Sequence, residues 1–479
     1  MTHDEAIKAS DVCGEPDAAS GGGDRRQRQD ARGVFPLLTD AVSKAAAPLF
    51  VENLRRGSKP ASEWMCGVEF ELFGYDDAGS LERIDAAQVQ KVLAGFAPSS
   101  NDLVHEGGLL IEVNAGQMNR LTVEPGGQIE FSAAPQRSLA DVEREIRRYL
   151  SRLHEIAEGN CLLFVASGFD PLRTIEEQRW FPKLRYDVMR PFLASRGARA
   201  WDMMCRTCAV QTNLDYGSVE DLAKKFLLGN RLAAVVTAIF ANSPFENGRL
   251  SGYKSTRAAA WLETDDDRTG VSPPALADTF SPEAFVAYAL EVPMIFVQRD
   301  GRYLSGPAGM KFGDFLERGY DTVQPVFGDW ADHLTTLFTD ARLKQYIELR
   351  SADSGGLRMA LALQALWKGL MYDAAALDEA LRLAPKLSLE EMRALQETVA
   401  RYGLAARSAH VNVSGIAKEV IALASEGLAR IAPEESRYMD VLRQQVIEDE
   451  VCPADILLRN WHGSWHGQIK RAIEYLRIA

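Results

Sequence analysis

Two glutamates two positions apart are the first residues whose chemistry stands out. Glu69 and Glu71 alternate with Phe70 and Leu72 within residues 65–75, a pattern that predicts a strand with both carboxylates on one face. Two negative charges on one face repel each other unless solvent or a cation separates them. Mg²⁺ prefers carboxylate oxygens and would suit the pair, although a solvated strand face is the more common explanation of such charges.

A second acidic segment surrounds a tight turn. Glu124 and Glu130 flank Pro125-Gly126-Gly127, and Gln128 shares a strand face with Glu130. Proline followed by paired glycines predicts a turn or bulge in which backbones approach closely. Oxygen ligands from this segment would complement the first glutamate pair, whereas the alternative is an ordinary polar hairpin.

A third segment combines a cation, an aromatic ring and a run of acids. Arg257 and Trp261 stand four residues apart, so a helix would place them on one face. An arginine binds a carboxylate through two parallel hydrogen bonds, and an aromatic neighbour shapes the pocket around it. Residues 265–268 then place three aspartates beside an arginine, a mixture found at nucleotide-phosphate sites and also in ordinary loops.

The elements that must position these residues follow from the spacing of apolar side chains. Further strands are expected at residues 109–113, 121–131 and 209–215. Helices are expected at residues 139–156, at 218–241 with Ser218 and Asp221 as a capping-box pair, and after Ser388 with Glu391 as another. Because strands dominate the first half and helices the end of the chain, we expect an α+β fold with a helical C-terminal portion.

The composition is that of an acidic globular chain. Its 479 residues include 54 Lys and Arg against 67 Asp and Glu, a net charge of −13. This charge argues against general nucleic-acid binding, but not against an anionic substrate held by local basic residues. Residues 21–30 carry no apolar side chain, so we expect residues 1–33 to be a disordered tail before one large catalytic domain at 34–479.

The sequence also allows an expectation about location. The first ten residues lack an apolar run, and no stretch of 18 apolar residues occurs anywhere. Neither a secretory signal nor a transmembrane helix is therefore expected. Six cysteines in this length are ordinary for a reducing compartment, and we expect a cytoplasmic protein that binds neither nucleic acid nor membrane.

Several other motifs fail on their spacing. Residues 248–256 resemble a phosphate-binding loop but have too few residues between the glycines. His462 and His466 lack an acidic partner for zinc. Cys205 and Cys208 form a CxxC pair without a second pair, so they are either redox-sensitive or, more simply, buried inert thiols. The absence of a Gly-x-Ser-x-Gly segment leaves an α/β-hydrolase without its main support.

Taken in order, these segments resemble the plant-type glutamate–cysteine ligase family, which many bacteria share. The resemblance covers about residues 35–479. It rests on residues 67–74, 124–132, 206–215 and 241–245, on Arg257 and Trp261, and on residues 264–270, 288–294, 329–336, 348–353 and 458–476.

The resemblance implies a glutamine-synthetase-like fold, a curved and largely antiparallel sheet with flanking helices that holds ATP and divalent metal. It implies that ATP phosphorylates the γ-carboxylate of L-glutamate and that the amine of L-cysteine then displaces phosphate. The product would be γ-glutamylcysteine, the first step of glutathione biosynthesis. Phosphoryl transfer between two anions needs charge neutralisation, which Mg²⁺ supplies.

The resemblance also implies a role for each candidate residue. The implied metal ligands are Glu69, Glu71, Glu124, Glu130 and Gln211. Glutamate would be bound by Arg257 and Trp261, with Val210, Thr212 and Arg206 also in the substrate site. The nucleotide would contact Asp267 and Arg268, and the transferring phosphate would be stabilised by Arg268 and Arg350.

Two positions depart from the family pattern. The family usually has His between the two acids of its first motif and Lys after the second, where this chain has Phe70 and Leu72. Phe70 should face away from the metals, whereas a lost cation at Leu72 would affect ligand contacts near that strand. Cys205 is an addition beside the usual Cys208. A divergent paralogue that joins glutamate, or a similar carboxylate, to another amine therefore stays open.

Two further classes of protein remain as alternatives. A guanidino-type phosphotransferase would use similar chemistry on a similar fold. A non-catalytic relative would bind metabolites only, although the four retained glutamates argue against it.

Overall fold

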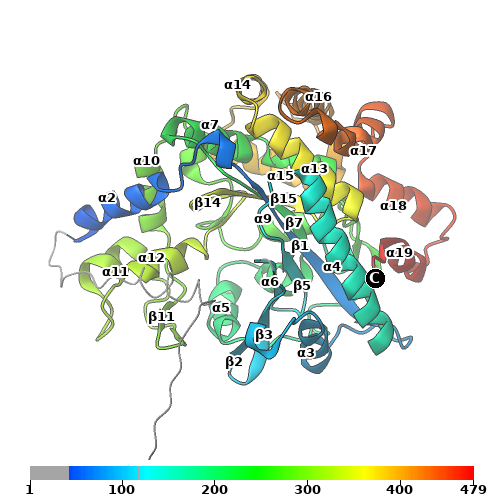
Figure 1. Ribbon diagram of the computed structural model, residues 1–479, viewed down its shortest axis with the longest axis horizontal. Coiled ribbons are helices and arrows are strands. Elements are labelled where there is room, and N and C mark those ends of the chain that lie inside the picture. The colour runs from blue at the N-terminus through cyan, green and yellow to red at the C-terminus, as the bar shows by residue number, and fades with distance from the viewer. Residues whose placement is uncertain (1–41, 117, 409) are drawn as a thin grey trace, which may run out of the picture.

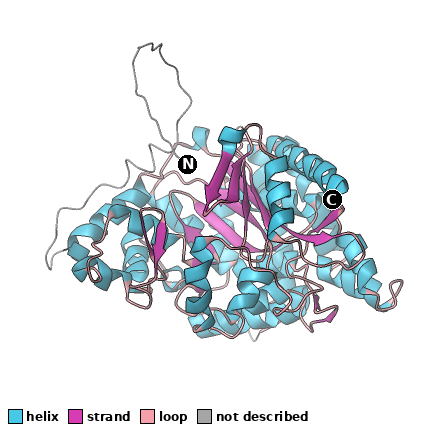
Figure 2. Ribbon diagram, turned by 90° about the horizontal axis from the view of Figure 1, so that it is seen from below, coloured by secondary structure: helices cyan, strands magenta, loops and turns pink. Residues whose placement is uncertain are grey.

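A nine-stranded sheet runs through the centre of the protein, with helices around it (Figures 1 and 2). The structure is a computed structural model that describes residues 42–116, 118–408 and 410–479, so the predicted tail over residues 1–33 lies outside the described residues. In the described part, no helix is both long and apolar enough to cross a membrane.

The sheet is antiparallel at each of its pairings. Its order is β14-β15-β7-β1-β5-β4-β3-β2, and β6 pairs with the far end of β1. The strands are β1 (Cys66–Asp76), β2 (Leu103–Glu106), β3 (Leu109–Asn114), β4 (Arg120–Val123), β5 (Ile129–Ser132), β6 (Leu162–Val165), β7 (Ala209–Leu214), β14 (Ala341–Leu343) and β15 (Ile347–Asp353). The predicted α+β class with a largely antiparallel sheet is confirmed.

Three two-stranded pairs lie outside this sheet. They are β8 (Phe245–Glu246) with β9 (Arg249–Leu250), β10 (Thr269–Gly270) with β13 (Phe338–Thr339), and β11 (Val297–Arg299) with β12 (Arg302–Leu304). The parallel pair β10 and β13 joins the predicted aspartate-rich turn to the segment that leads into β14.

Helices occupy most of the remaining chain. Before residue 300 they are α2 (Val42–Arg55), α3 (Ala86–Gly95), α4 (Leu139–Asn160), α5 (Leu184–Ala194), α6 (Ala200–Arg206), α7 (Val219–Arg231), α8 (Ala233–Phe240), α9 (Thr256–Leu262) and α10 (Pro282–Glu291). After it they are α11 (Phe312–Arg318), α12 (Phe327–Leu334), α13 (Leu357–Met371), α14 (Ala374–Leu383), α15 (Leu389–Tyr402), α16 (Val413–Ile431), α17 (Asp440–Leu442), α18 (Pro453–His462) and α19 (Ile469–Leu476). Figure 1 shows the last of these gathered on one side of the molecule, as the predicted helical C-terminal portion requires.

The two faces of the sheet differ in character because side chains alternate along each strand. In β1 the side chains of Phe70 and Leu72 are fully buried. Phe70 pairs across the sheet with Phe131, whose ring stacks on Tyr149 of α4 at 4.4 Å between ring centroids. This face is the apolar core beneath α4 and α13, and Glu69 and Glu71 therefore lie on the opposite face.

Local signals in the sequence have the predicted structural effect. Ser218 caps α7 by accepting a hydrogen bond from the Asp221 amide, and Ser388 and Glu391 form a complete capping box on α15. The helix predicted over residues 218–241 is divided into α7 and α8 at Leu232. The turn after Glu124 closes with a hydrogen bond of 2.9 Å from the Gly127 amide to the Glu124 carbonyl, and Gly127 has a φ of 75°.

Candidate active site

Two adjoining cavities open beside the polar face of the sheet. The first, here called the sheet cavity, has a volume of about 210 Å³ and lies against β1, β5 and β7. The second, the helix cavity, has a volume of about 340 Å³ and lies among α8, α9, α10 and α15. The side chains of Arg257, Trp261, Phe338 and Arg350 line both cavities and form the wall between them.

One wall of the sheet cavity is acidic. Glu69 and Glu71 come from β1, Glu130 from β5, and Glu124 from the turn before it. Glu71 and Glu130 are directly opposite in the antiparallel register. The sheet thus brings together the two acidic motifs that the sequence shows 53 residues apart, counted from Glu71 to Glu124.

Neighbouring strands hold these carboxylates through hydrogen bonds. The side-chain amide of Asn213 donates to Glu69 at 2.9 Å, and that of Gln211 donates to Glu71 at 3.1 Å. The Ala209 amide donates to Glu71 at 2.6 Å. These donors stand at alternate positions of β7, so one face of that strand supports the acidic wall.

Burial and mutual repulsion disfavour the charged forms of three carboxylates in the acidic wall. Burial and repulsion by Glu348 and Glu130 raise the pKa of Glu69 to about 7. Burial and repulsion by Glu124 raise the pKa of Glu130 to about 7, and burial with the charge of Glu130 raises the pKa of Glu71 well above its usual range. A cation bound beside these carboxylates would lower their raised pKa values, because it favours their charged form.

Basic side chains also line the sheet cavity and are here called the basic wall. It is formed by Lys183, Arg185, Arg257, Arg342 and Arg350. Among the described residues, five cations and four carboxylates therefore line one small cavity. Such an arrangement fits a polyphosphate with its bound cations better than it fits a neutral ligand.

Glu348 fixes two of these arginines. It is fully buried in β15 and forms ion pairs with Arg342, Lys344 and Arg350. Burial acts against its charged form, but these three cations hold the pKa of Glu348 well below its usual range. Arg342 stands opposite Glu348 in the β14–β15 register, so the hairpin itself sets the geometry of the pair.

An irregularity in β15 aims Arg350 at the cavity. The register with β7 shifts between Leu349 and Ala352, so that Arg350 and Ser351 together oppose Gln211. A bulge of this kind bends a strand and redirects a side chain. The Arg350 guanidinium then reaches both Glu348 and the side-chain oxygen of Gln211.

The wall between the cavities is built on α9. Ser255 caps this helix by accepting from the Ala258 amide, and the predicted one-face relation of Arg257 and Trp261 is confirmed. The centroid of the Trp261 ring is 5.9 Å from the guanidinium carbon of Arg257 and 5.9 Å from that of Arg350. An aromatic ring at this distance attracts each cation.

Comparison with known proteins identifies the family. The sequence profile of glutamate–cysteine ligase family 2 matches residues 65–475. The chloroplastic glutamate–cysteine ligase of Medicago truncatula is 36% identical over 449 residues, which is 92% of this chain and 87% of that protein. The corresponding protein of Nicotiana tabacum is 36% identical over 460 residues, which is 94% of this chain and 87% of that protein.

The chain belongs to glutamate–cysteine ligase family 2.

The fold agrees with this assignment. A crystal structure of glutamate–cysteine ligase from Francisella tularensis in complex with AMP superposes with a TM-score of 0.53 at 12% sequence identity. The match covers 86% of this chain and 87% of that one. The predicted family and fold are confirmed, and with them the class of enzyme, a glutamate–cysteine ligase of glutathione biosynthesis.

The predicted cytoplasmic location is wrong by the same comparison. The plant relatives from M. truncatula, N. tabacum, Solanum lycopersicum and Arabidopsis thaliana are all named as chloroplastic. The features behind the prediction, cysteine usage and the lack of an apolar leader, separate secreted from non-secreted proteins and do not distinguish an organelle from the cytosol.

Most of the residues predicted for this family member's site lie at the cavities. Glu69, Glu71, Glu124, Glu130 and Gln211 line the sheet cavity, Asp267 lines the helix cavity, and Arg257, Trp261 and Arg350 line both. Gln128 also lines the sheet cavity, but its side-chain oxygen accepts from the Gly126 amide and its side-chain nitrogen donates to the carbonyls of Met204 and Thr207. The contacts of Gln128 are those of a turn support.

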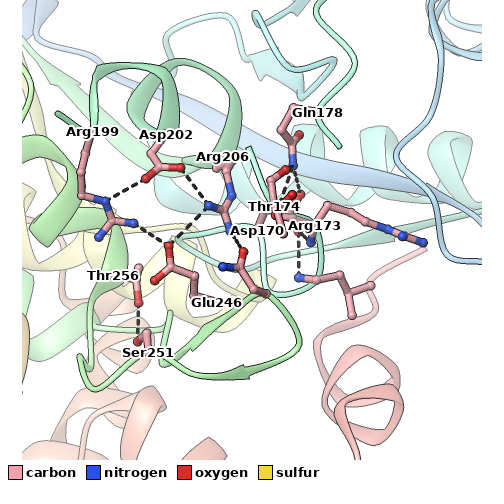
Figure 3. Close-up of polar contacts among 12 residues, drawn as sticks. Asp170, Arg173, Thr174, Gln178, Arg199, Asp202, Arg206, Glu246, Ser251 and Thr256 are labelled. Carbon is pink, nitrogen blue, oxygen red and sulfur yellow. Dashed lines mark hydrogen bonds and ion pairs between the residues drawn. The ribbon is translucent and has the colours of Figure 1, made fainter. Parts of the chain in front are cut away.

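Arg206 does not reach either cavity. Its side chain is buried and forms ion pairs with Asp202 and Glu246, while its second terminal nitrogen donates to Asn247 at 2.6 Å. Arg199 binds the same two acids, which closes a four-membered ionic network between α6 and the β8–β9 hairpin (Figure 3). The predicted substrate contact of Arg206 is replaced in the structure by this network.

Arg268 is also engaged elsewhere. It is fully buried, with its guanidinium bonded to Asp265 at 2.6 Å and to the carbonyls of Thr336 and Pro293. The turn that places acids beside this base bends Arg268 back onto Asp265, three residues earlier. Arg268 therefore stabilises the turn beside the helix cavity. Its side chain lines neither the helix cavity nor the sheet cavity.

Val210 and Thr212 lie on the wrong face to line the substrate site. Gln211 points into the sheet cavity, so its two neighbours in β7 point into the core on the opposite face, where both are buried.

The cysteines Cys205 and Cys208 are buried as well, and burial raises the pKa of each thiol. Both observations agree with the interpretation that these thiols are inert.

Several residues of the basic wall were not singled out from the sequence. Lys183 and Arg185 stand at the start of α5, where no spacing signal marks them. Arg342 and Glu348 are six residues apart in the β14–β15 hairpin. Opposite charges across a short hairpin were a usable signal for that pair.

Proposed function

We propose that the protein joins the γ-carboxylate of L-glutamate to the amine of L-cysteine, with ATP cleaved to ADP and phosphate through a γ-glutamyl phosphate. The observation that carries this proposal is the pair of cavities that meet at Arg257, Trp261 and Arg350. One cavity has the charges for a triphosphate, and the other has room for amino acids. Their shared wall is where a phosphoryl group and a carboxylate would meet.

ATP is assigned to the sheet cavity. The basic residues Lys183, Arg185 and Arg342 line it and would bind the phosphate oxygens. Glu69, Glu71, Glu124 and Glu130 would hold Mg²⁺, which neutralises phosphate charge when it is bound. Gln211 is a weaker candidate because its side-chain oxygen accepts from Arg350 and its nitrogen donates to Glu71.

The four glutamates fit such a cation in charge and type, but not as a rigid preformed cage. Within the described residues, no three acidic, histidine or cysteine side chains converge closely enough to hold a metal ion. Glu69 and Glu71 accept hydrogen bonds from Asn213 and Gln211 instead. Cation binding would therefore rotate these carboxylates away from amide partners that are easily replaced by water.

Arg350 is assigned to the phosphoryl transfer itself. In the first step a γ-carboxylate oxygen of glutamate attacks the terminal phosphorus of ATP and ADP leaves. In the second, the amine attacks the activated carbonyl carbon, phosphate leaves and the amine loses a proton. Arg350, held by Glu348 at the shared wall, would stabilise the negative charge on the phosphoryl oxygens.

The two departures from the family motif do not alter the cavities. Phe70 and Leu72 are fully buried on the core face of β1, and neither lines the sheet cavity or the helix cavity. The cation that this chain lacks at Leu72 therefore costs no ligand contact in this structure. This favours L-cysteine as the acceptor over the alternative, a paralogue that uses a different amine.

The acceptor is tested with the purified full chain, ATP, Mg²⁺, glutamate and a panel of amines, with the products identified by mass. We expect γ-glutamylcysteine and stoichiometric ADP. Product with another amine but not with cysteine would establish the paralogue. A stable phosphorylated product without an amide bond would instead show a phosphotransferase.

A single catalytic domain over residues 34–479 is part of this proposal. The two cavities draw their lining from Glu69 in β1 to Gln396 in α15. A chain segment must therefore include at least residues 69–396 to contain every lining residue.

A further inference from the structure

The helix cavity contains one carboxylate that is unlike its neighbours. Four acidic side chains of the described residues line this cavity: Asp266, Asp267, Glu291 and Asp340. Asp266 pairs with Arg393, Asp267 with Arg196, and Glu291 with Lys311. Asp340 forms no ion pair with any residue in the described part of the chain.

The position of Asp340 is nevertheless fixed. Its amide donates to the Gly270 carbonyl at 2.8 Å, and its own carbonyl accepts from the Arg350 amide at 2.9 Å. One carboxylate oxygen, Oδ2, accepts a hydrogen bond of 2.7 Å from the side-chain amide of Gln396 on α15. The other oxygen has no hydrogen-bond donor among the described residues, so a ligand could supply one.

The surroundings of Asp340 favour a ligand that carries both charges. Arg257 and Arg350 line the same cavity. Burial raises the pKa of the Asp340 carboxyl, whereas the hydrogen bond from Gln396 and the charges of Arg257 and Arg350 act in the opposite direction. A carboxylate without an ion pair beside two arginines matches the ammonium and carboxylate groups of an amino acid.

We propose that Asp340 binds the α-ammonium group of the glutamate substrate and that Gln396 positions its carboxylate. The proposal rests on the proposed function, because it names the group that selects the carboxylate donor of that reaction. The substrate class is an α-amino acid with a side-chain carboxylate, which is preferred over a dicarboxylate without the amino group.

The donor is favoured over the acceptor because of what happens to each amine. The acceptor amine must lose its proton before it attacks a carbonyl carbon. The glutamate ammonium stays charged through both steps. A carboxylate that stabilises an ammonium group therefore helps the donor and would hinder the acceptor.

The test compares Asp340→Asn with the wild-type protein on two donors, glutamate and glutarate, which is glutamate without its amino group. Asparagine keeps the shape and can still accept from Gln396, but it lacks the charge. We expect wild type to prefer glutamate, and Asp340→Asn to reduce the ratio of kcat/KM for glutamate over glutarate by about 10- to 100-fold. KM for ATP and for cysteine should change by less than about twofold, within the variation of sites that do not touch the altered group.

Glu283→Gln is the matched control. Glu283 lies on α10, is exposed and paired with Arg55, and lines neither cavity, so this variant should keep the wild-type ratio. Gln396→Met should move the ratio in the same direction as Asp340→Asn by a smaller factor. It also serves as the second variant if Asp340→Asn does not fold.

Two results would overturn the proposal. One is an unchanged glutamate-to-glutarate ratio in a folded, active Asp340→Asn protein. The other is a selective rise of KM for cysteine, which would assign Asp340 to the acceptor. Calorimetric binding of glutamate and glutarate separates this proposal from the proposed function. The wild-type protein could form no γ-glutamyl product while Asp340→Asn still loses the preference for binding glutamate over glutarate. In that case only the proposed function fails.

Discussion

The guanidinium of Arg257 donates a hydrogen bond of 2.7 Å to the backbone carbonyl of Arg350. That carbonyl lies in the irregular stretch of β15 where the register with β7 shifts. The bulge that directs the Arg350 side chain therefore also positions Arg257. Both guanidinium groups reach the wall between the cavities because of this local break in strand pairing.

Replacing Arg350 with lysine should reduce catalysis while the fold is retained. Lysine keeps a positive charge but lacks the planar guanidinium, whose Nη1 donates to both Glu348 and Gln211. Glu348 would still be paired with Arg342 and Lys344, so no buried charge is left alone. We expect kcat to fall by about 100-fold or more, measured by steady-state ADP release. A variant with wild-type kcat would remove Arg350 from the transfer step.

Replacing Glu130 with glutamine should change the response to Mg²⁺. The substitution removes one acid from the proposed cation site, so the Mg²⁺ concentration for half-maximal activity should rise by about 10-fold or more. Glu112→Gln is the control, because Glu112 lies on β3, is paired with Arg120, and lines neither cavity. Equal Mg²⁺ titrations of wild type and Glu130→Gln would contradict the assignment of the acidic wall.

Arg206→Met tests whether Arg206 is structural. Its removal leaves Asp202 and Glu246 dependent on Arg199 alone, which should lower the free energy of unfolding by about 3 kcal/mol. Denaturant unfolding measures the change. KM for glutamate should stay near the wild-type value in the folded fraction. A large rise in that KM with unchanged stability would restore the predicted substrate role.

Leu72→Lys tests whether the missing family cation matters. Leu72 is fully buried among apolar side chains, so a lysine there should destabilise the protein by about 4 kcal/mol without raising activity. Leu72→Met, which nearly conserves volume, should cost less than about 1.5 kcal/mol. Higher activity in Leu72→Lys would show that this position communicates with the ligands after all.

Burial of His333 should make the protein less stable to unfolding as the pH falls. Its ring stacks on Phe312 at 4.4 Å between ring centroids and its Nε2 lies 2.8 Å from the Ala289 carbonyl. Burial lowers the pKa of His333 from 6.5 to about 3. As the pH falls below 6.5 the unfolded chain binds a proton that the folded protein does not. The contribution of His333 to stability is therefore complete above pH 6.5 and is lost on the way to pH 3.

The comparison with His333→Gln isolates this effect. Glutamine can donate to the same carbonyl but does not titrate. The stability advantage of wild type over His333→Gln should shrink by about 2 kcal/mol between pH 7 and pH 5, measured by chemical denaturation at each pH. A constant difference across that range would show that His333 is not held neutral in the folded protein.

The parts of the site that could be predicted are those in which local periodicity determines direction. Glu69 and Glu71 alternate with buried residues in one strand, and Arg257 and Trp261 share one helix face, so their relative placement follows from the chain itself. The same rule could have corrected one error. If Gln211 faces the cavity, Val210 and Thr212 must face the core.

The remaining errors and omissions depend on contacts between distant segments. Arg206 and Glu246 are 40 residues apart, and their pairing depends on how the β8–β9 hairpin packs against α6. Asp340 is distinguished only by the ion pairs that its neighbours make with Arg196, Lys311 and Arg393. No local pattern in the sequence shows which of several acids forms no ion pair in the folded protein.

In the proposed reaction, glutamate is activated as an acyl phosphate before the amine attacks. This order is measured with glutamate labelled with ¹⁸O in its γ-carboxylate, with ATP, Mg²⁺ and cysteine present and the released phosphate analysed by mass. We expect one ¹⁸O atom in each phosphate released, together with γ-glutamylcysteine. Unlabelled phosphate, or labelled glutamate recovered unchanged while ATP is consumed, would contradict it.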